Sequence, residues 1–192
     1  MKYNFFAMLS RMKYINRWGL MRNTRLENIA EHSLDVSIIA HALAIIKNTY
    51  FDGKTDPDHV AVLAMFHDTT EIITGDLPTP IKYYAPDIKN AYKDIEKTAA
   101  DQLIDELPEE MKELYSGIMH ENEDDYNFKI VKAADKISAI IKCIEERRMG
   151  NMDFAEAEKT LTQYVENMHM PEADYFLENF LPAYSLTLDE QT

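Results

Sequence analysis

The sequence predicts an all-α protein, a single compact bundle of about seven to nine helices. Apolar residues recur at helical spacing along almost the whole chain, whereas alternating, strand-like runs are scarce. A length of 192 residues suits one domain, so residues 1–192 are expected to share one core. With 46% apolar and 28% charged residues, the composition is that of a globular protein and argues against extensive disorder.

The expected helices are marked by starting and stopping residues as well as by periodicity. Asn28 with Glu31 three residues later resembles a capping box. Asp56 followed by Pro57 fits an N-cap and a first helical position, and Gly75 fits a stop. The segments expected to be helical are 5–16, 29–47, 57–74, 86–107, 108–120, 128–148, 154–168 and 172–181.

Between the third and fourth of these helices, the run Gly75-Asp76-Leu77-Pro78-Thr79-Pro80 predicts a stiff loop, because its two prolines cannot continue a helix. Another irregular stretch is expected over 17–23. Farther along, Asn127 can cap the helix over 128–148, and Gly150 can end it. Such a bundle has enough helices to enclose a site between them.

Charge and glycine content exclude several classes of function. A net charge of −14 argues against binding a nucleic-acid polymer over a general basic surface. The first 27 residues nevertheless carry six cations and one anion, Glu27, which leaves −19 on the rest of the chain. This basic segment suits a compact anion such as one phosphate group, although a solvated face or a subunit contact would also explain it. No Gly-rich phosphate loop of the Rossmann or P-loop type occurs.

The chain is expected to be a soluble cytoplasmic protein without a membrane partner. Its longest uncharged internal stretch, 36–46, is shorter than the roughly 20 apolar residues that a membrane span requires. The N-terminal residues lack the long apolar region of a secretory signal. A single cysteine, Cys143, excludes an internal disulfide framework and fits a reducing compartment.

Four side chains within apolar helical segments are candidate metal ligands: His32, His67, Asp68 and Asp135. Burying an aspartate costs free energy, so each of these carboxylates needs a partner or a metal. Two imidazoles and two carboxylates suit one divalent transition metal, but such a donor set does not choose among Mn, Fe, Co, Ni and Zn. The residue types alone leave open that these are satisfied core residues.

The order of these four residues resembles the H…HD…D signature of the HD-domain metal-dependent phosphohydrolases, an all-α superfamily. Further segments resemble its bacterial 5′-deoxynucleotidase branch, from the N-terminus to the tail at 182–184: Ile15-Asn16-Arg17-Trp18, Leu20-Met21-Arg22-Asn23, Glu31-His32-Ser33-Leu34 and the Gly75 to Pro80 run. The resemblance implies one HD domain over residues 1–192. It also implies a homodimer that hydrolyses deoxyribonucleoside 5′-monophosphates to deoxynucleoside and phosphate with one divalent metal ion.

The resemblance also implies roles for single residues. The four candidate ligands match the metal ligands of the family. Arg17 matches its phosphate-binding arginine, a catalytic and substrate-binding residue, and Trp18 matches a residue beside the sugar that helps to exclude a ribose 2′-hydroxyl. Asp76 matches an acidic residue of the substrate site, and Glu71 matches the acid assigned to proton handling.

Independent physical reasoning agrees with a proton-handling role for Glu71. It follows His67 by four residues and Asp68 by three, so an uninterrupted helix would bring the three side chains to one face. From there a carboxyl group could exchange a proton with the nucleophilic water or with the leaving 5′-oxygen. The sequence leaves the choice between them open.

Two other functions compete with this one. The first is an HD phosphohydrolase acting on another nucleotide, triphosphate or cyclic, or on a phosphorylated metabolite. A triphosphate carries more negative charge and should demand more cations than surround Arg17. The second is a non-catalytic all-α interaction module, in which Arg17 and Glu71 have no reason to lie beside a metal.

Overall fold

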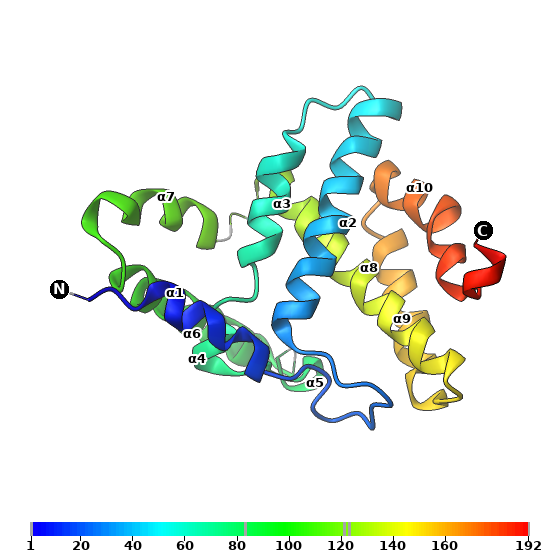
Figure 1. Cartoon of the computed structure of the whole chain (residues 1–192), viewed down its shortest axis with the longest axis horizontal. Coiled ribbons are helices and arrows are strands. Elements are labelled where there is room, and N and C mark those ends of the chain that lie inside the picture. Colours follow the sequence, from blue (N-terminus) through cyan, green and yellow to red (C-terminus); the bar gives the residue numbers. More distant parts are fainter. Residues whose placement is uncertain (1, 83, 121, 123, 192) are drawn as a thin grey trace. The chain divides into compact units, whose positions relative to one another are not determined.

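The structure is a computed structural model that describes residues 2–82, 84–120, 122 and 124–191. Within these residues it is all-α, as predicted, and the β pairing is one isolated antiparallel bridge between Asn16 and Asn28 (Figure 1). Eight of its α-helices exceed four residues, in agreement with the predicted number. The α-helices are α1 Phe5–Leu9, α2 Ile29–Tyr50, α3 Pro57–Phe66, α4 Glu71–Thr74, α5 Thr79–Lys82, α6 Pro86–Asp105, α7 Glu109–Met119, α8 Tyr126–Arg148, α9 Ala155–Glu166 and α10 Pro171–Asn179.

The chain forms two compact units. The first unit comprises Met1–Met21, Leu26–Ser33 and Phe66–Asn122, and therefore holds α1 and α4 to α7. The second unit comprises Arg22–Arg25, Leu34–Met65 and Glu123–Thr192, and holds α3, most of α2 and α8 to α10.

The first unit has its own apolar core, made by α1, α6 and α7. Phe5 of α1 is fully buried, and its ring lies 4.8 Å from that of Tyr115 in an edge-to-face arrangement. Leu103 of α6 and Met119 of α7 are buried in the same cluster. Each aromatic residue in such a core contributes a large apolar area, so this cluster stabilises the unit that carries most of the predicted site.

The second unit is built around α8, which packs against α9. Ile137 and Ile140 of α8 are almost fully buried, as are Phe154 and Val165. Helix α2 is long and apolar enough, by length and composition, to cross a membrane, although the uncharged run within it is short. Its most apolar 18-residue window has a mean hydropathy of 1.5, and 56% of that window is buried inside the protein.

Capping of α2 follows the prediction from Asn28, whose Oδ1 accepts hydrogen bonds from the backbone N–H groups of Ala30 and Glu31, both at 3.0 Å. The predicted continuous helix over 57–74 is wrong, because α3 ends at Phe66 and a turn precedes α4. In this turn the Thr69 hydroxyl donates to the Phe66 carbonyl at 2.8 Å, a side-chain bond that competes with the helical ladder.

Two further predictions need correction. The run from Gly75 to Pro80 is a loop only in its first part, because α5 begins at Thr79 and so contains the second proline in its first turn, where a proline is tolerated. The N-cap of α8 is Asp125 rather than Asn127: its Oδ1 accepts from the backbone N–H of Asn127 at 2.9 Å. The capping residue therefore lies two positions earlier than expected.

Candidate metal and phosphate site

The first unit brings together three of the four candidate metal ligands. His32 lies in the first turn of α2, the helix that Asn28 caps, and is fully buried. His67 and Asp68 lie in the turn between α3 and α4. The two imidazole rings have their centroids 5.3 Å apart. Residues separated by 35 positions in the sequence thus form one cluster.

The distances within this cluster suit a shared cation. Oδ2 of Asp68 lies 3.2 Å from Nε2 of His67 and 3.5 Å from Nε2 of His32. Two ligand atoms that are each about 2.1 Å from one ion, at angles of about 90–109°, would be about 3.0–3.4 Å apart. Imidazole nitrogens with a carboxylate oxygen are also a donor set that first-row divalent metals accept. His32, His67 and Asp68 therefore fit a metal by chemistry and by spacing.

Arg17 lies directly beside this cluster. Its Nη1 donates to Oε2 of Glu27 at 2.8 Å and lies 2.9 Å from Nδ1 of His32. Its side chain is only 13% exposed. A guanidinium keeps its charge in such a setting and presents a planar fork of donors, which is the geometry that phosphate oxygens accept.

Trp18 is held by two carboxylates at opposite ends of the residue. Its backbone N–H donates to Oδ2 of Asp76 at 3.2 Å, and its indole N–H donates to Oε2 of Glu27 at 3.2 Å. The Arg17 guanidinium carbon lies 5.9 Å from the centroid of the indole ring, within the range of a cation–π interaction. The backbone of Trp18 has a φ of 60°, in the left-handed region that non-glycine residues seldom adopt.

Glu71, the first residue of α4, is 7% exposed. Burial, together with the nearby carboxylates of Asp68 and Asp76, raises the pKa of Glu71 to about 10, although Arg17 opposes the shift. Among the described residues, Oε2 of Glu71 has no hydrogen-bond partner. A buried carboxyl oxygen of this kind is suited to a ligand or a water molecule. Because the helix is interrupted before Glu71, the turn and not helical periodicity places this residue near Asp68.

Asp76 lies in the loop after α4. Burial raises the pKa of Asp76, and the Asp68 carboxylate acts in the same direction, while Arg17 and the hydrogen bond from Trp18 oppose the rise. Lys82 of α5, which could have reached a phosphate, donates to Oε1 of Glu96 at 2.8 Å. The Arg17 guanidinium contacts the histidine cluster directly, at Nδ1 of His32.

Asp135, the fourth candidate ligand, belongs to the second unit. It lies in the middle of α8, its side chain is 19% exposed, and its Oδ2 accepts from the ammonium group of Lys136 at 2.7 Å.

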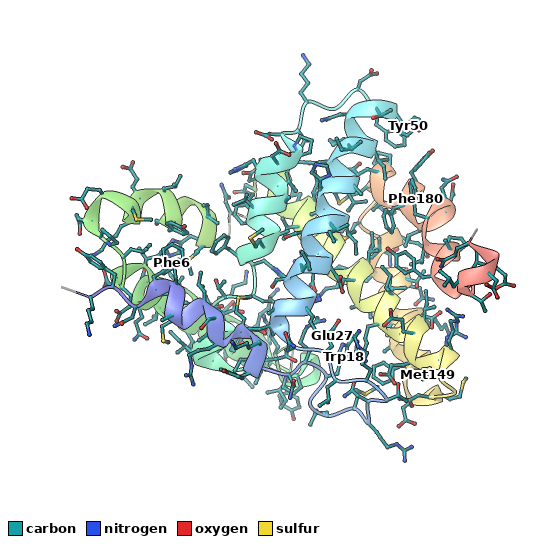
Figure 2. All side chains as sticks on the ribbon, viewed as in Figure 1. Phe6, Trp18, Glu27, Tyr50, Met149 and Phe180 are labelled. Atoms are coloured by element: carbon teal, nitrogen blue, oxygen red, sulfur yellow. The ribbon has the colours of Figure 1, made fainter. Side chains whose placement is uncertain are left out.

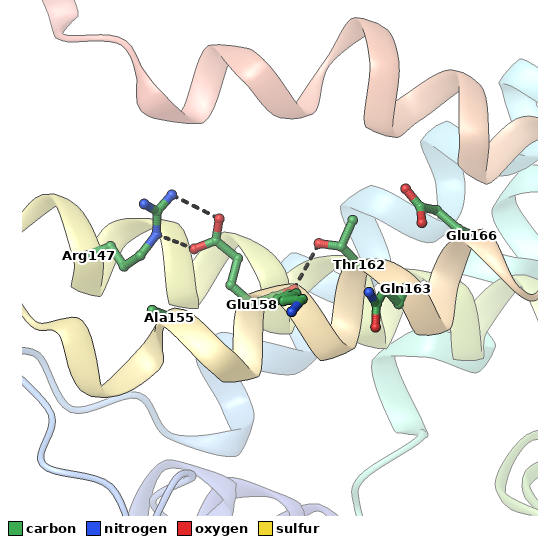
Figure 3. Close-up of a pocket in the computed structure, with 7 residues that line it drawn as sticks. Arg147, Ala155, Glu158, Thr162, Gln163 and Glu166 are labelled. Carbon is green, nitrogen blue, oxygen red and sulfur yellow. Dashed lines mark hydrogen bonds and ion pairs between the residues drawn. The ribbon is translucent and has the colours of Figure 1, made fainter.

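A pocket of about 430 Å³ lies elsewhere on the second unit, along α9 and the end of α8 (Figure 3). Arg147 forms a two-point ion pair there with Glu158, in which Nη2 donates to Oε1 at 2.9 Å. The other charged residues of its lining, Lys159 and Glu166, balance each other. None of the predicted site residues lines this pocket, and its charges do not favour an anion.

Sequence reasoning missed one residue of the site, Glu27. In the sequence it stands out only as a charge, yet Glu27 is 7% exposed and accepts hydrogen bonds from both Arg17 and Trp18. The available signal was its position as the one acid among the first 27 residues, where six cations occur.

Comparisons with known proteins were made against families, sequences and structures. The model of the family described as 5′-deoxynucleotidase YfbR-like matches residues 4–184. A 5′-deoxynucleotidase of Photobacterium profundum is 51% identical over 192 residues, which is 98% of each chain.

Two solved structures are similar in fold. An HD-domain phosphohydrolase of Listeria innocua has a TM-score of 0.83 at 24% identity and covers 98% of this chain and 92% of its own. The HD phosphohydrolase of cyanophage S-2L, solved with dA and one catalytic Zn²⁺ ion, has a TM-score of 0.67 at 19% identity. That match covers 95% of this chain and 99% of the phage protein.

Proposed function

Because the chain belongs to the 5′-deoxynucleotidase YfbR-like family, we infer that it is a phosphoric monoester hydrolase that removes the 5′-phosphate from deoxyribonucleoside monophosphates. The family match confirms the resemblance seen in the sequence. One structural observation carries the inference: a partly buried arginine lies beside two histidines and an aspartate whose spacing suits a cation. This arrangement suits phosphate recognition together with metal binding, and a non-catalytic module would need neither.

The chain's own residues supply recognition and proton transfer in this reaction. Arg17 would hold the non-bridging oxygens of the phosphate, and Trp18 would lie against the sugar where a ribose 2′-hydroxyl would project. Asp76 fixes the backbone of Trp18 through its hydrogen bond. Glu71 would exchange a proton with the attacking water or the leaving 5′-oxygen as the P–O bond breaks.

His32, His67 and Asp68 would hold one divalent metal ion, and we propose Asp135 as the fourth ligand. A metal bound there would polarise a phosphoryl oxygen and lower the pKa of water, and both effects would reduce the very high barrier to hydrolysis of phosphate monoesters. The proposal for Asp135 is supported by its place in the family signature. The cyanophage relative was solved with zinc, but nitrogen and oxygen donors leave Mn, Fe, Co, Ni and Zn as candidates for this chain.

A substrate panel tests the function. Deoxyribonucleoside 5′-monophosphates, their 3′ isomers and the ribonucleotides are each assayed for phosphate release, with chelator and with single metals added back. We expect turnover of the 5′-deoxy compounds only, lost with chelator and restored by at least one metal. Release of pyrophosphate from triphosphates would instead indicate another HD phosphohydrolase, and no release from any ester would indicate an interaction module.

We also propose that the enzyme acts in the cytoplasm as a homodimer, with residues 1–192 working as one catalytic domain and without a nucleic-acid polymer or a membrane as partner. The single, buried Cys143 supports a reducing compartment. Exposed aromatic residues of the second unit support a subunit contact: Tyr50 stacks on Tyr175 at 4.7 Å, and both Tyr50 and Phe180 remain exposed. Sedimentation at several concentrations tests the dimer, and a monomer throughout would contradict it.

A further inference from the structure

We propose that Glu27 is a positioning residue that couples phosphate recognition to sugar recognition by holding the side chains of Arg17 and Trp18 on one carboxylate oxygen. Both donors converge on Oε2, Nη1 of Arg17 at 2.8 Å and Nε1 of Trp18 at 3.2 Å. Figure 2 shows Glu27 and Trp18 beside each other. The inference deepens the proposed function and rests on it.

The main chain holds Glu27 in register with the residues that it contacts. The carbonyl of Glu27 accepts from the backbone N–H of Arg17 at 2.9 Å, and the backbone N–H of Ile29 donates to the carbonyl of Ile15 at 3.0 Å. The bridge between Asn16 and Asn28 lies between these two bonds. The two short segments are therefore paired, and the Glu27 side chain has a defined origin from which to orient its partners.

The side chains of Arg17 and Glu27 are largely shielded from water, so the orientation of their contacts affects their energy. The side chains of Arg17 and Glu27 are only 13% and 8% exposed, so the carboxylate has lost most of its hydration and depends on its two donors. A negative charge beside Arg17 would by itself weaken the attraction of that arginine for phosphate. We therefore expect the Glu27 carboxylate to act through orientation, because it fixes the guanidinium of Arg17 and the indole plane of Trp18 with respect to each other.

Trp18 is the only tryptophan in the sequence, so its fluorescence reports directly on this contact. The experiment compares wild type with Glu27→Ala, Glu27→Gln and Glu27→Asp. Glu113→Ala serves as the matched control, because Glu113 is an exposed acid on α7 of the same unit. Two readouts are taken for each protein with metal added: kcat and KM on matched deoxyribo- and ribonucleoside 5′-monophosphates, and quenching of Trp18 emission by acrylamide.

We expect Glu27→Ala to raise KM for the deoxy substrate about tenfold and to lower the deoxy-to-ribo ratio of kcat/KM about tenfold, with a smaller effect on kcat, because two partly buried donors lose the acceptor that they share. Quenching of Trp18 should increase as well. Glu27→Gln retains a carbonyl oxygen that can occupy the place of Oε2, so its selectivity should stay within about threefold of wild type. Glu113→Ala should match wild type in every readout.

A folded Glu27→Ala protein with unchanged selectivity and unchanged quenching would overturn the proposal. Should that variant fail to fold, Glu27→Asp decides, because its side chain is one methylene shorter and cannot reach both donors. The proposal is supported if Glu27→Asp loses the selectivity for deoxyribonucleotides and Glu27→Gln keeps it. Equal selectivity in these two variants contradicts the proposal. Absence of phosphate release by the wild-type protein would count against the proposed function alone, since the quenching series still tests the hold of Glu27 on Trp18.

Discussion

Nη1 of Arg17 lies 2.9 Å from Nδ1 of His32, so the residue proposed to hold phosphate is in direct contact with a residue proposed to hold metal. A guanidinium has no acceptor atom, and Nδ1 must therefore accept this hydrogen bond. In the neutral ring the proton then lies on Nε2, which faces Asp68. A metal at Nε2 would require the proton on Nδ1, where it conflicts with the Arg17 donor.

Replacement of Arg17 should therefore change the affinities for metal and phosphate in opposite directions. Arg17→Met preserves side-chain length but removes the charge and the donor to His32. We expect its affinity for a divalent metal to rise about fivefold, since one hydrogen bond no longer competes and a nearby positive charge is gone. Its KM for substrate should rise at least about tenfold. Calorimetric titration with metal measures the first effect, and Arg11→Met, an exposed position, is the control. Weaker metal binding by Arg17→Met would contradict this account.

Glu71→Gln should lower kcat by about 10²–10⁴-fold, the range for loss of a general acid or base, while leaving the fold intact. A substrate with a good leaving group separates the two roles. If Glu71 protonates the leaving oxygen, p-nitrophenyl phosphate should be much less affected than a nucleotide. An equal loss on both substrates assigns Glu71 to the attacking water, and an unchanged kcat on both removes it from the mechanism.

The raised pKa of Glu71 has a consequence for the metal-free protein. Between the ordinary pKa of 4.5 and the folded value of about 10, the folded state keeps a proton that the unfolded state releases. The free energy of unfolding should therefore fall as pH rises through this window. Glu71→Gln removes that slope, so its melting temperature relative to wild type should be higher at alkaline than at acidic pH, by about 2–4 °C per kcal/mol. Calorimetry in chelator at several pH values measures the difference, and a constant difference would contradict the assignment.

Asp135→Asn tests the fourth ligand. The substitution keeps the size of the side chain and removes its charge, so we expect metal affinity to fall at least about tenfold, a loss that even outer residues of metal sites can cause. Activity should fall most when metal is limiting and recover in part at saturation. Metal content after dialysis gives the measurement, with Asp94→Asn on the exposed surface of α6 as the control. Unchanged affinity would contradict a ligand role for Asp135.

Glu146 is expected to be a main source of stability in the second unit. This residue of α8 is 1% exposed, and it accepts from the backbone N–H and hydroxyl of Thr24 at 2.9 and 2.7 Å and from Asn151 at 2.8 Å. Burial would raise the pKa of Glu146, but hydrogen bonds from Lys142, Asn151 and Thr24 outweigh it and lower the pKa.

Glu146→Ala should therefore cost about 3–5 kcal/mol of unfolding free energy, because it leaves the buried ammonium group of Lys142 without its carboxylate partner. The contribution of the carboxylate is present above the ordinary pKa of 4.5 and is lost as pH falls below it, so wild type and variant should converge in acid. Denaturant unfolding measures the loss, and Glu145→Ala at the exposed neighbouring position should change little. If the free energy of unfolding falls by less than about 1 kcal/mol, the hydrogen bonds and ion pair of Glu146 contribute little to stability.

Local chemistry explains how much of the fold could be predicted. Start signals such as Asn28 act over two or three residues, so the beginning of α2 was predictable, and the structure has the same cap. The break between α3 and α4 was not predictable from apolar spacing, because it depends on the bond from Thr69 to the Phe66 carbonyl. A hydroxyl that competes with the helical ladder leaves the hydrophobic period unchanged.

The site divides in a similar way. His32, His67 and Asp68 could be named because their order resembles a family signature, and the structure places them together within the first unit. Asp135 remains a prediction. Glu27 could not be recognised, since its role depends on a main-chain pairing between 15–17 and 27–29 that periodicity does not reveal.

The backbone of Trp18 has a φ of 60°, and this conformation links the thermal stability of the protein to its selectivity for deoxyribonucleotides over ribonucleotides. A non-glycine residue in this conformation costs about 1–3 kcal/mol, so Trp18→Gly should relieve strain even as it deletes the indole that would screen the sugar. A laboratory selection for thermal resistance alone would therefore tend to favour variants at this position that accept ribonucleotides. To raise thermal stability without losing selectivity for deoxyribose, substitutions should therefore be made at positions other than Trp18.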